Sequence, residues 1–289
     1  MNRIRMTLIV ASTLMMACSM RPMFSYEESG SVASSPPGTP PRTPPHDAST
    51  YDGSLPTCVR TKVGCLELET VYIAGVVECE LGSLTNSAAA LEAQAIAART
   101  FLGRYLARKG PTAMVHLGPR FQCWRKPRFP RSVAVALATA GNVILWDGAL
   151  INANYVAGTR KLNFDCRPKG PGASGYPFSS WSDLLRARKA RKGRVPGVSG
   201  TDWTEIYVTH NEGRVGRQVA HTPIGWKTGF NRGALSQNAA ACLGKNLKYE
   251  TMNILKYFYG DDIVLSHPLR AVTSVVGRRI EPLAMSPAP

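Results

Sequence analysis

The segment "YIAGVVECE", Tyr72–Glu80, is followed closely by "ALEAQAIAARTF", Ala90–Phe101, and these two stretches decide the fold. If the first segment is helical, residues at i, i+3, i+4 and i+7 share one face. Those residues are Ile73, Val76, Val77 and Glu80. The β-branched content also permits a strand, but the alanine-rich stretch that follows favours a pair of helices.

The two acidic residues at the end of this segment differ in their expected surroundings. In a helix Glu80 lies at the edge of the apolar stripe, whereas Glu78 points away from it toward water. Apolar surroundings disfavour an ionised carboxyl group, which raises its pKa toward the range of a general acid. Glu80 is therefore the candidate acid. The alternative is a helix-terminal glutamate that pairs with a nearby arginine. In a strand, Glu78 and Glu80 would lie on the same side.

Residues 58–268 show the mixed helices and strands of a single α+β domain. An apolar face predicts a helix over 88–110, through Leu91, Ala95, Ala98, Leu102 and Tyr105. Two apolar runs over 142–158 meet at Asp147-Gly148, which predicts a β-hairpin. "TEIYVTH", 204–210, is predicted to be a strand. Two further helices are predicted over 236–246 and 248–260, each ended by a glycine.

The chain before this domain has the features of an exported protein. Residues 1–18 carry two arginines, an apolar stretch and Cys18, as in a secretory signal peptide that is too short to span a bilayer. A cysteine at the cleavage point resembles a bacterial lipobox, so lipidation of Cys18 is expected, with plain secretion as the alternative. The Pro/Ser-rich residues 19–57 predict a disordered tether, and 269–289 form a C-terminal tail. We expect a membrane-anchored lipoprotein of the cell envelope that faces the periplasm or the outside.

The 289 residues carry a formal net charge of +16, and lysines and arginines are spread along the chain. The densest run, 186–194, is either a solvated loop or a surface for a polyanion such as nucleic acid, an anionic membrane or a cell-wall polymer. Because the chain is predicted to be exported, we expect no nucleic-acid partner. The expected contacts are cell-wall polymers, and the membrane through the N-terminal lipid.

Six cysteines remain after Cys18, an even number that predicts up to three disulfides in an oxidising compartment. Cys58 and Cys65 are close enough for a small local loop, and Cys123 with Cys166 would bracket the hairpin. The sequence alone does not decide the pairing. It contains no CxxC or HExxH pattern, so neither a metal site nor another cofactor is predicted.

Four ordered motifs of this chain resemble those of the SpoIID/LytB domain family, the stage II sporulation protein D family. The family shows a tyrosine, a Gly-Val-Val and an acidic residue five after the glycine, followed by an "ALKAQAVAARTY"-like helix. With the glycine at Gly75, the matching acid is Glu80. "FQCW", 121–124, resembles the family's Gln-x-Tyr, with Gln122 retained and Trp124 as the aromatic residue. The hairpin at 139–155 and "NRGALSQ" at 231–237 resemble the remaining two motifs.

This resemblance implies an exported lytic transglycosylase that cleaves peptidoglycan glycan strands. Such an enzyme needs no attacking water, because the muramic acid's 6-hydroxyl closes onto its own anomeric carbon. One residue, here Glu80, can therefore act as both acid and base. Further residues would bind the sugars or, for Arg99, orient Glu80 or anchor a lactyl carboxylate. The expected substrate-binding residues are Arg99, Gln122, Trp124, Tyr155, Arg232, Ser236 and Gln237.

The chain also departs from the family's pattern. Gly82 replaces a proline, Gly158, Thr159 and Cys166 stand where many members carry a Ser/Cys motif linked in some to zinc, and Phe230 lies where a histidine is usual. Two alternatives to the enzyme therefore stay open. One is a non-catalytic glycan-binding partner that stimulates a cell-wall amidase, and the other is a scaffold without chemistry.

Overall fold

The computed structural model describes residues 51–82, 84–118, 121–169, 183, 186, 201–224 and 229–267. The predicted signal peptide, the lipidation site Cys18, most of the tether, most of the basic run 186–194 and the tail 269–289 lie outside these residues. The tether was predicted to extend to Thr57, yet residues 51–57 already contact the domain. The Tyr51 N–H donates to the Gly148 carbonyl (3.2 Å), and Leu55 packs against the core.

The described residues form an α+β fold, as predicted. The helical elements are η1 (Leu68–Ile73, a π-helix), α1 (Ala74–Glu80), α2 (Ala88–Lys109), α3 (Pro130–Ala138), the 3₁₀-helices η2 (Asp202–Tyr207) and η3 (Gly216–Gln218), α5 (Gln237–Asn246) and α6 (Thr251–Tyr259). The strands are β1 (Cys58–Thr61), β2 (Gly64–Glu67), β3 (Ile144–Trp146), β4 (Ala149–Leu150), β5 (Asn154–Val156), β6 (Ala234–Ser236) and β7 (Val264–Leu265).

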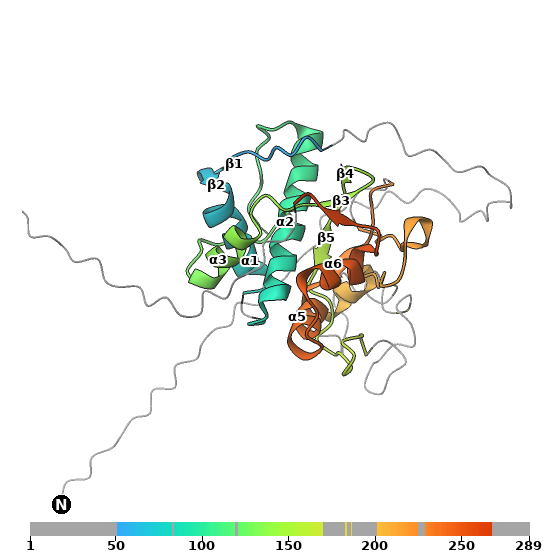
Figure 1. Cartoon of the computed structure of the whole chain (residues 1–289). Helices are drawn as coiled ribbons and strands as arrows, with labels where there is room; N and C mark the ends of the chain where they lie inside the picture. The colour runs from blue at the N-terminus through green and yellow to red at the C-terminus, as the bar shows by residue number, and fades with distance from the viewer. Residues whose placement is uncertain are drawn as a thin grey trace, which may run out of the picture.

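Helix α2 is the central element, with α1 and α3 on one side and α5 and α6 on the other (Figure 1). The Ser87 hydroxyl accepts the Ala90 N–H (3.4 Å) and so caps its first turn. Gly110 ends the helix with φ of 97°, a conformation that suits glycine. Most of the side chains between these ends are buried, so α2 forms the middle of the hydrophobic core.

The strands form three small sheets. β1 pairs with β2, and β3 lies between β4 and β7, all antiparallel. The predicted turn joins β3 to β4, with Asp147 and Gly148 both at positive φ (52° and 74°). The hairpin is shorter than expected, because the chain leaves it after Leu150. β5 then pairs in parallel with β6, far along the sequence.

Two other local predictions are wrong. "TEIYVTH" was predicted to be a strand, but most of it lies in η2, where the side chains of Asp202, Thr204 and Glu205 accept hydrogen bonds from the loop after β5. Helix α5 ends at Asn246, as the predicted range 236–246 has it, but Gly244 lies inside the helix and does not end it. Gly244 instead leaves room for Ser87, because a Cβ at this position would overlap the Ser87 hydroxyl oxygen.

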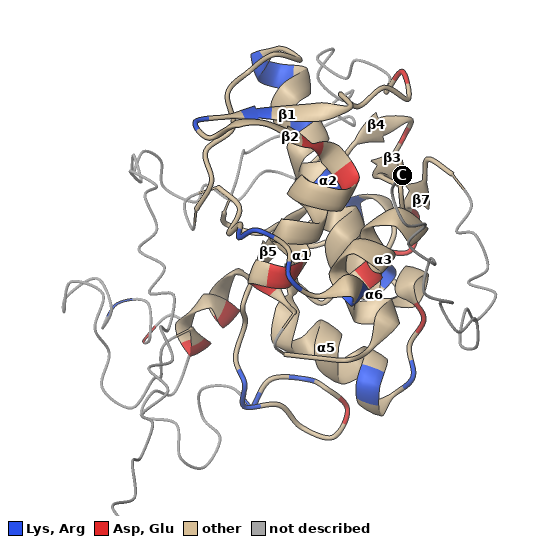
Figure 2. Cartoon of the chain, turned by 90° about the vertical axis from the view of Figure 1, so that its left-hand side faces the viewer, with Lys and Arg blue, Asp and Glu red and all other residues tan. Residues whose placement is uncertain are grey.

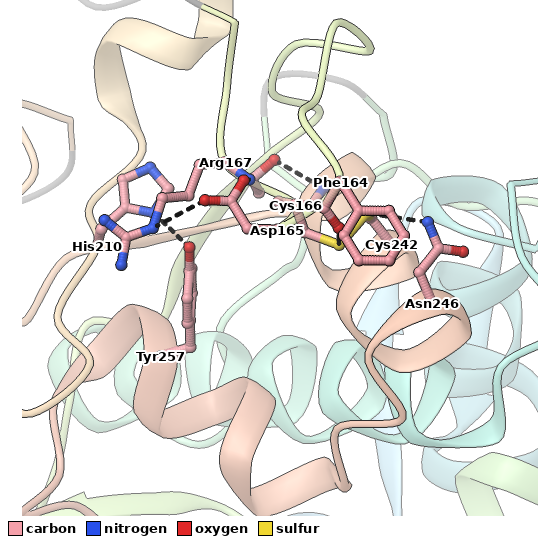
Figure 3. Close-up of a disulfide and its surroundings, with 10 residues drawn as sticks. Phe164, Asp165, Cys166, Arg167, His210, Cys242, Asn246 and Tyr257 are labelled. Carbon is pink, nitrogen blue, oxygen red and sulfur yellow. Dashed lines mark hydrogen bonds and ion pairs between the residues drawn. A yellow bond between two sulfur atoms is a disulfide. The ribbon is translucent and has the colours of Figure 1, made fainter.

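Three disulfides are present in the described part of the chain. Cys58–Cys65 closes the β1–β2 hairpin, as expected. The expected Cys123–Cys166 pairing is wrong: Cys123 pairs with Cys79 of α1, and Cys166 pairs with Cys242 of α5 (Figure 3). The reason is the short hairpin. Once β5 pairs with β6, the following loop lies beside α5 and not beside the segment that holds Cys123.

Candidate active site around Glu80

Glu80, the last residue of α1, is half-buried and holds two hydrogen bonds from neutral donors. Its Oε1 accepts the backbone N–H of Cys123 (2.7 Å), and its Oε2 accepts the side-chain amide of Gln237 (2.9 Å). Burial raises the pKa of the Glu80 carboxyl, and the hydrogen bonds from Gln237 and Cys123 oppose this rise because they favour the ionised form. A carboxyl group with a raised pKa can act as a general acid near neutral pH.

Two segments from distant parts of the sequence fix this carboxyl group on α1. The Cys79–Cys123 disulfide, one residue before Glu80, ties α1 to the segment that supplies the Cys123 N–H. Gln237 is the first residue of α5, directly after β6, and the neighbouring Ser236 hydroxyl caps this helix by accepting the Ala239 N–H (3.2 Å). The β6–α5 junction therefore determines where the Gln237 amide meets Glu80.

A second set of side chains, centred on Gln122, lies close to Glu80. The Tyr72 hydroxyl donates to Gln122 Oε1 (2.6 Å), and Gln122 Nε2 donates to the Tyr155 hydroxyl (2.8 Å) and to the Ala98 carbonyl (3.0 Å). Burial raises the pKa of both tyrosines, and the charge of Glu80 raises them further. Both hydroxyls therefore stay protonated and can donate hydrogen bonds beside the carboxyl group.

The structure thus brings together Glu80, Gln122, Tyr155 and Gln237, four of the residues that the sequence analysis selected. Two neighbours were missed. Tyr72 is the first residue of the quoted segment, but the sequence analysis gave it no role at the site. The fully buried Gln94 of α2 lies with its Oε1 3.5 Å from Gln237 Nε2. A buried amide in an otherwise apolar helix face is the signal that could have identified Gln94.

Trp124 packs along the helix that carries Glu80. Its indole N–H donates to the Val71 carbonyl (3.1 Å), and its ring lies directly against Gly75. A Cβ at Gly75 would lie 2.3 Å from Trp124 Nε1 and 2.4 Å from the Arg125 carbonyl oxygen. Trp124 is only partly buried, so one part of its surface is open to solvent, while the rest holds the 123–125 segment against α1.

Two predicted binding residues are buried elsewhere. Arg99 is fully buried, and its guanidinium pairs with Glu69 (2.5 Å) and donates to the carbonyls of Ala136 and Asn142. Arg232 is also buried, forms an ion pair with Asp262 and lies over the ring of Trp146. Both therefore stabilise the fold, and neither orients Glu80 as expected for Arg99.

The expectation that Glu78 points to water is also corrected. Glu78 is buried, and its Oε2 accepts the N–H groups of Arg128 (2.8 Å) and Phe129 (2.9 Å), while the Arg125 guanidinium lies 3.6 Å from Oε1. The helical-face argument failed because the 125–129 backbone covers the side of α1 that the local pattern leaves open. Glu78 is an anchor for this segment.

Residues 60–146 match the family model described as SpoIID, stage II sporulation protein. This part of the chain is therefore similar to the SpoIID family. It contains η1, α1, α2, α3 and β3, and with them Glu80, Gln122 and Trp124. The match confirms the predicted resemblance and indicates a role related to the cell wall. Among curated proteins, no sequence matches the chain.

Outside residues 60–146, residues that depart from the family's pattern have partners of their own. Cys166 is taken by its disulfide with Cys242, and Phe230 is buried under the guanidinium of Arg104 (4.8 Å) and against Trp146. Glu205 of η2 is a further buried carboxylate, missed by the sequence analysis; its Oε2 accepts the Thr159 N–H (2.7 Å). Within the described residues, no group of three or more His, Cys, Asp or Glu side chains could hold a metal ion. No helix among them is long and apolar enough to cross a bilayer.

Proposed function

We propose that the protein is a lytic transglycosylase that cleaves peptidoglycan glycan strands with Glu80 as its acid and base. The observation that carries the proposal is the surroundings of this carboxyl group. It is half-buried, its pKa is raised by burial, and its hydrogen-bond partners are a backbone N–H and an amide instead of a cation. A carboxyl group paired with arginine would stay ionised and could not donate a proton.

In the proposed reaction, protonated Glu80 gives its proton to the oxygen between the two sugars as the bond to the muramic acid's anomeric carbon breaks. The leaving sugar departs with a hydroxyl group. The ionised Glu80 then takes the proton of the muramic acid's 6-hydroxyl as that oxygen bonds to the anomeric carbon, which forms the 1,6-anhydro ring and restores the acid. The Cys123 N–H and the Gln237 amide stabilise the carboxylate between the two steps.

The neighbouring side chains divide between substrate contact and support. Tyr155 is half-buried, so its hydroxyl and the exposed part of the Trp124 ring can contact sugars. The side-chain amide of Gln122 forms hydrogen bonds with Tyr72, Tyr155 and the Ala98 carbonyl, so its role is to orient the two tyrosines. Ser236 is buried as the cap of α5, and it acts by placing Gln237. The proposal includes export to the cell envelope and a lipid anchor at Cys18.

A specific observation also favours the alternative of a glycan-binding enhancer of a cell-wall amidase. Both oxygens of Glu80 already accept hydrogen bonds, as expected for a carboxylate that is fixed for binding alone. The decisive measurement is digestion of purified glycan strands, with mass spectrometry of the ends, for the wild type, Glu80→Gln and the control Glu212→Gln. Transglycosylase action predicts 1,6-anhydro ends with the wild type and the control and none with Glu80→Gln. If the wild type binds the strands but none of the three proteins produces 1,6-anhydro ends, catalysis is refuted and the enhancer is supported.

A further inference from the structure

The segment "RKPRFPR", Arg125–Arg131, which we name the 125–131 loop, carries four cationic side chains and lies against α1, the helix that ends at the candidate acid. It follows directly after Cys123, whose N–H donates to Glu80, and after Trp124. In Figure 2 basic stretches of the chain pass beside the acidic residues of α1. Neither the proposed acid–base chemistry nor the sugar contacts of Tyr155 and Trp124 use these cations.

The 125–131 loop is fixed to α1 along its length. The Arg125 N–H donates to the Gly75 carbonyl (3.4 Å), and Glu78 accepts the N–H groups of Arg128 and Phe129. At its end, the Arg131 guanidinium donates to the Gly82 carbonyl and to the Asn86 side chain. Pro127 and Pro130 restrict the backbone further. A ligand that meets this loop therefore meets cations whose backbone is already ordered.

The four cations differ in what they bind. Arg125 lies beside the Glu78 carboxylate, and Arg131 donates to Gly82 and Asn86 in the segment between α1 and α2. Lys126 and Arg128 are exposed, and their side chains form no ion pair with any described residue. Arg99, expected from the sequence to anchor a substrate carboxylate, is buried against Glu69 instead. Within the 125–131 loop, Lys126 and Arg128 are therefore the cations that can meet an anionic ligand.

We propose that Lys126 and Arg128 form a carboxylate-binding subsite beside Glu80, which holds the lactyl carboxylates of the glycan strand. This inference rests on the proposed function, since it assumes that the strand passes Glu80. A muramic acid without a peptide carries a free carboxylate, so a strand presents a negative charge at each such sugar. Guanidinium and ammonium groups bind carboxylates through charge-assisted hydrogen bonds, and screening by salt weakens exposed pairs of this kind.

The test measures binding separately from cleavage. Glycan strands are immobilised in two forms, one with free lactyl carboxylates and one with the carboxylates converted to methyl esters. Binding is compared for Glu80→Gln alone, for Glu80→Gln with Lys126→Gln and Arg128→Gln, and for Glu80→Gln with Lys62→Gln and Arg217→Gln. The last protein loses the same charge from the β1–β2 turn and from η3. Thermal unfolding of each protein confirms that it is folded.

At low salt we expect the Lys126/Arg128 variant to bind free-carboxylate strands ~fivefold more weakly than Glu80→Gln, because two exposed charge pairs are lost. The control should change little, and all three proteins should bind the esterified strands alike. An equal loss for the control, or an equal loss on esterified strands, would overturn the subsite. A further outcome is that the wild type releases no anhydro ends while the Lys126/Arg128 variant still loses binding to free-carboxylate strands alone. That result would support the subsite and refute only the catalytic proposal.

Discussion

At the scale of single residues, the Glu80 carboxyl group is set apart by the neutrality of its hydrogen-bond donors. The other buried carboxylates near α1 meet cations: Glu69 pairs with Arg99, and Glu78 lies beside Arg125. Glu80 instead receives an N–H and an amide. Neutral donors stabilise the anion less than a guanidinium does, so burial dominates and the pKa of Glu80 is raised. Glu80 therefore holds its proton more tightly than an exposed glutamate does.

This raised pKa makes stability depend on pH through Glu80. Because the folded protein holds the Glu80 proton more tightly than the unfolded chain, its contribution is full below the ordinary carboxyl pKa and is lost as pH rises through the raised value. We predict that the free energy of unfolding of the wild type, relative to Glu80→Gln, falls as the pH rises above the ordinary glutamate pKa of about 4.3. Urea unfolding at several pH values measures this difference. A pH-independent difference between the two proteins would contradict it.

Sequence reasoning identified Glu80 but misplaced Glu78 and Arg99, and the contrast has a physical reason. The apolar stripe of one helix is a local property, and it correctly placed Glu80 at the edge of the core. What covers the opposite face depends on residues far along the chain, here the 125–129 backbone for Glu78 and the α3–β3 connection for Arg99. The pattern of a single helix does not contain that information.

At the scale of elements, the Arg99–Glu69 pair joins α2 to η1 and to the end of α3. Arg99 is fully buried, so removal of its partner leaves an uncompensated charge in the core. We predict that Glu69→Gln lowers the free energy of unfolding by about 3–5 kcal/mol. The double variant Glu69→Gln/Arg99→Met should lose less than the sum of the two single variants. Chemical denaturation of all four proteins tests this, and additive losses would show that the pair is not coupled.

Gly75 controls how closely the Trp124 segment approaches α1. Alanine would normally favour a helix interior by about 1 kcal/mol, but its Cβ would overlap Trp124 and the Arg125 carbonyl. We predict that Gly75→Ala lowers the free energy of unfolding by about 1–3 kcal/mol in spite of the helical preference.

The matched control for Gly75 is Gly103→Ala within α2. There a Cβ would lie 3.1 Å from a methyl group of Leu55 and 3.2 Å from one of Leu150, and both side chains can move. The loss at Gly103 should therefore be much smaller, as measured by thermal unfolding of both variants. A loss at Gly103 as large as that at Gly75 would show that general crowding decides the effect, and not the approach of Trp124.

At the scale of the whole molecule, local patterns predicted the long α2, the Asp147-Gly148 turn and α6, because periodicity and turn chemistry are contained in short stretches. The parallel pairing of β5 with β6 was not predicted, since it joins segments far apart in sequence. The same pairing explains the error in the cysteine partners. The position of β5 beside β6 places Cys166 next to α5, where it pairs with Cys242.

The disulfide pairing leads to a prediction about global stability. Cys166–Cys242 joins residues 76 apart, and Cys58–Cys65 joins residues only 7 apart. If disulfides act mainly by restricting the unfolded chain, the two contribute about 4.5 and about 2.4 kcal/mol at 25 °C. We predict that replacement of both cysteines by alanine costs about twice as much stability at Cys166–Cys242 as at Cys58–Cys65. Urea unfolding of the two paired variants measures the ratio. A larger loss at Cys58–Cys65 would mean that native contacts of the β1–β2 hairpin, and not chain entropy, determine the contribution of that bond.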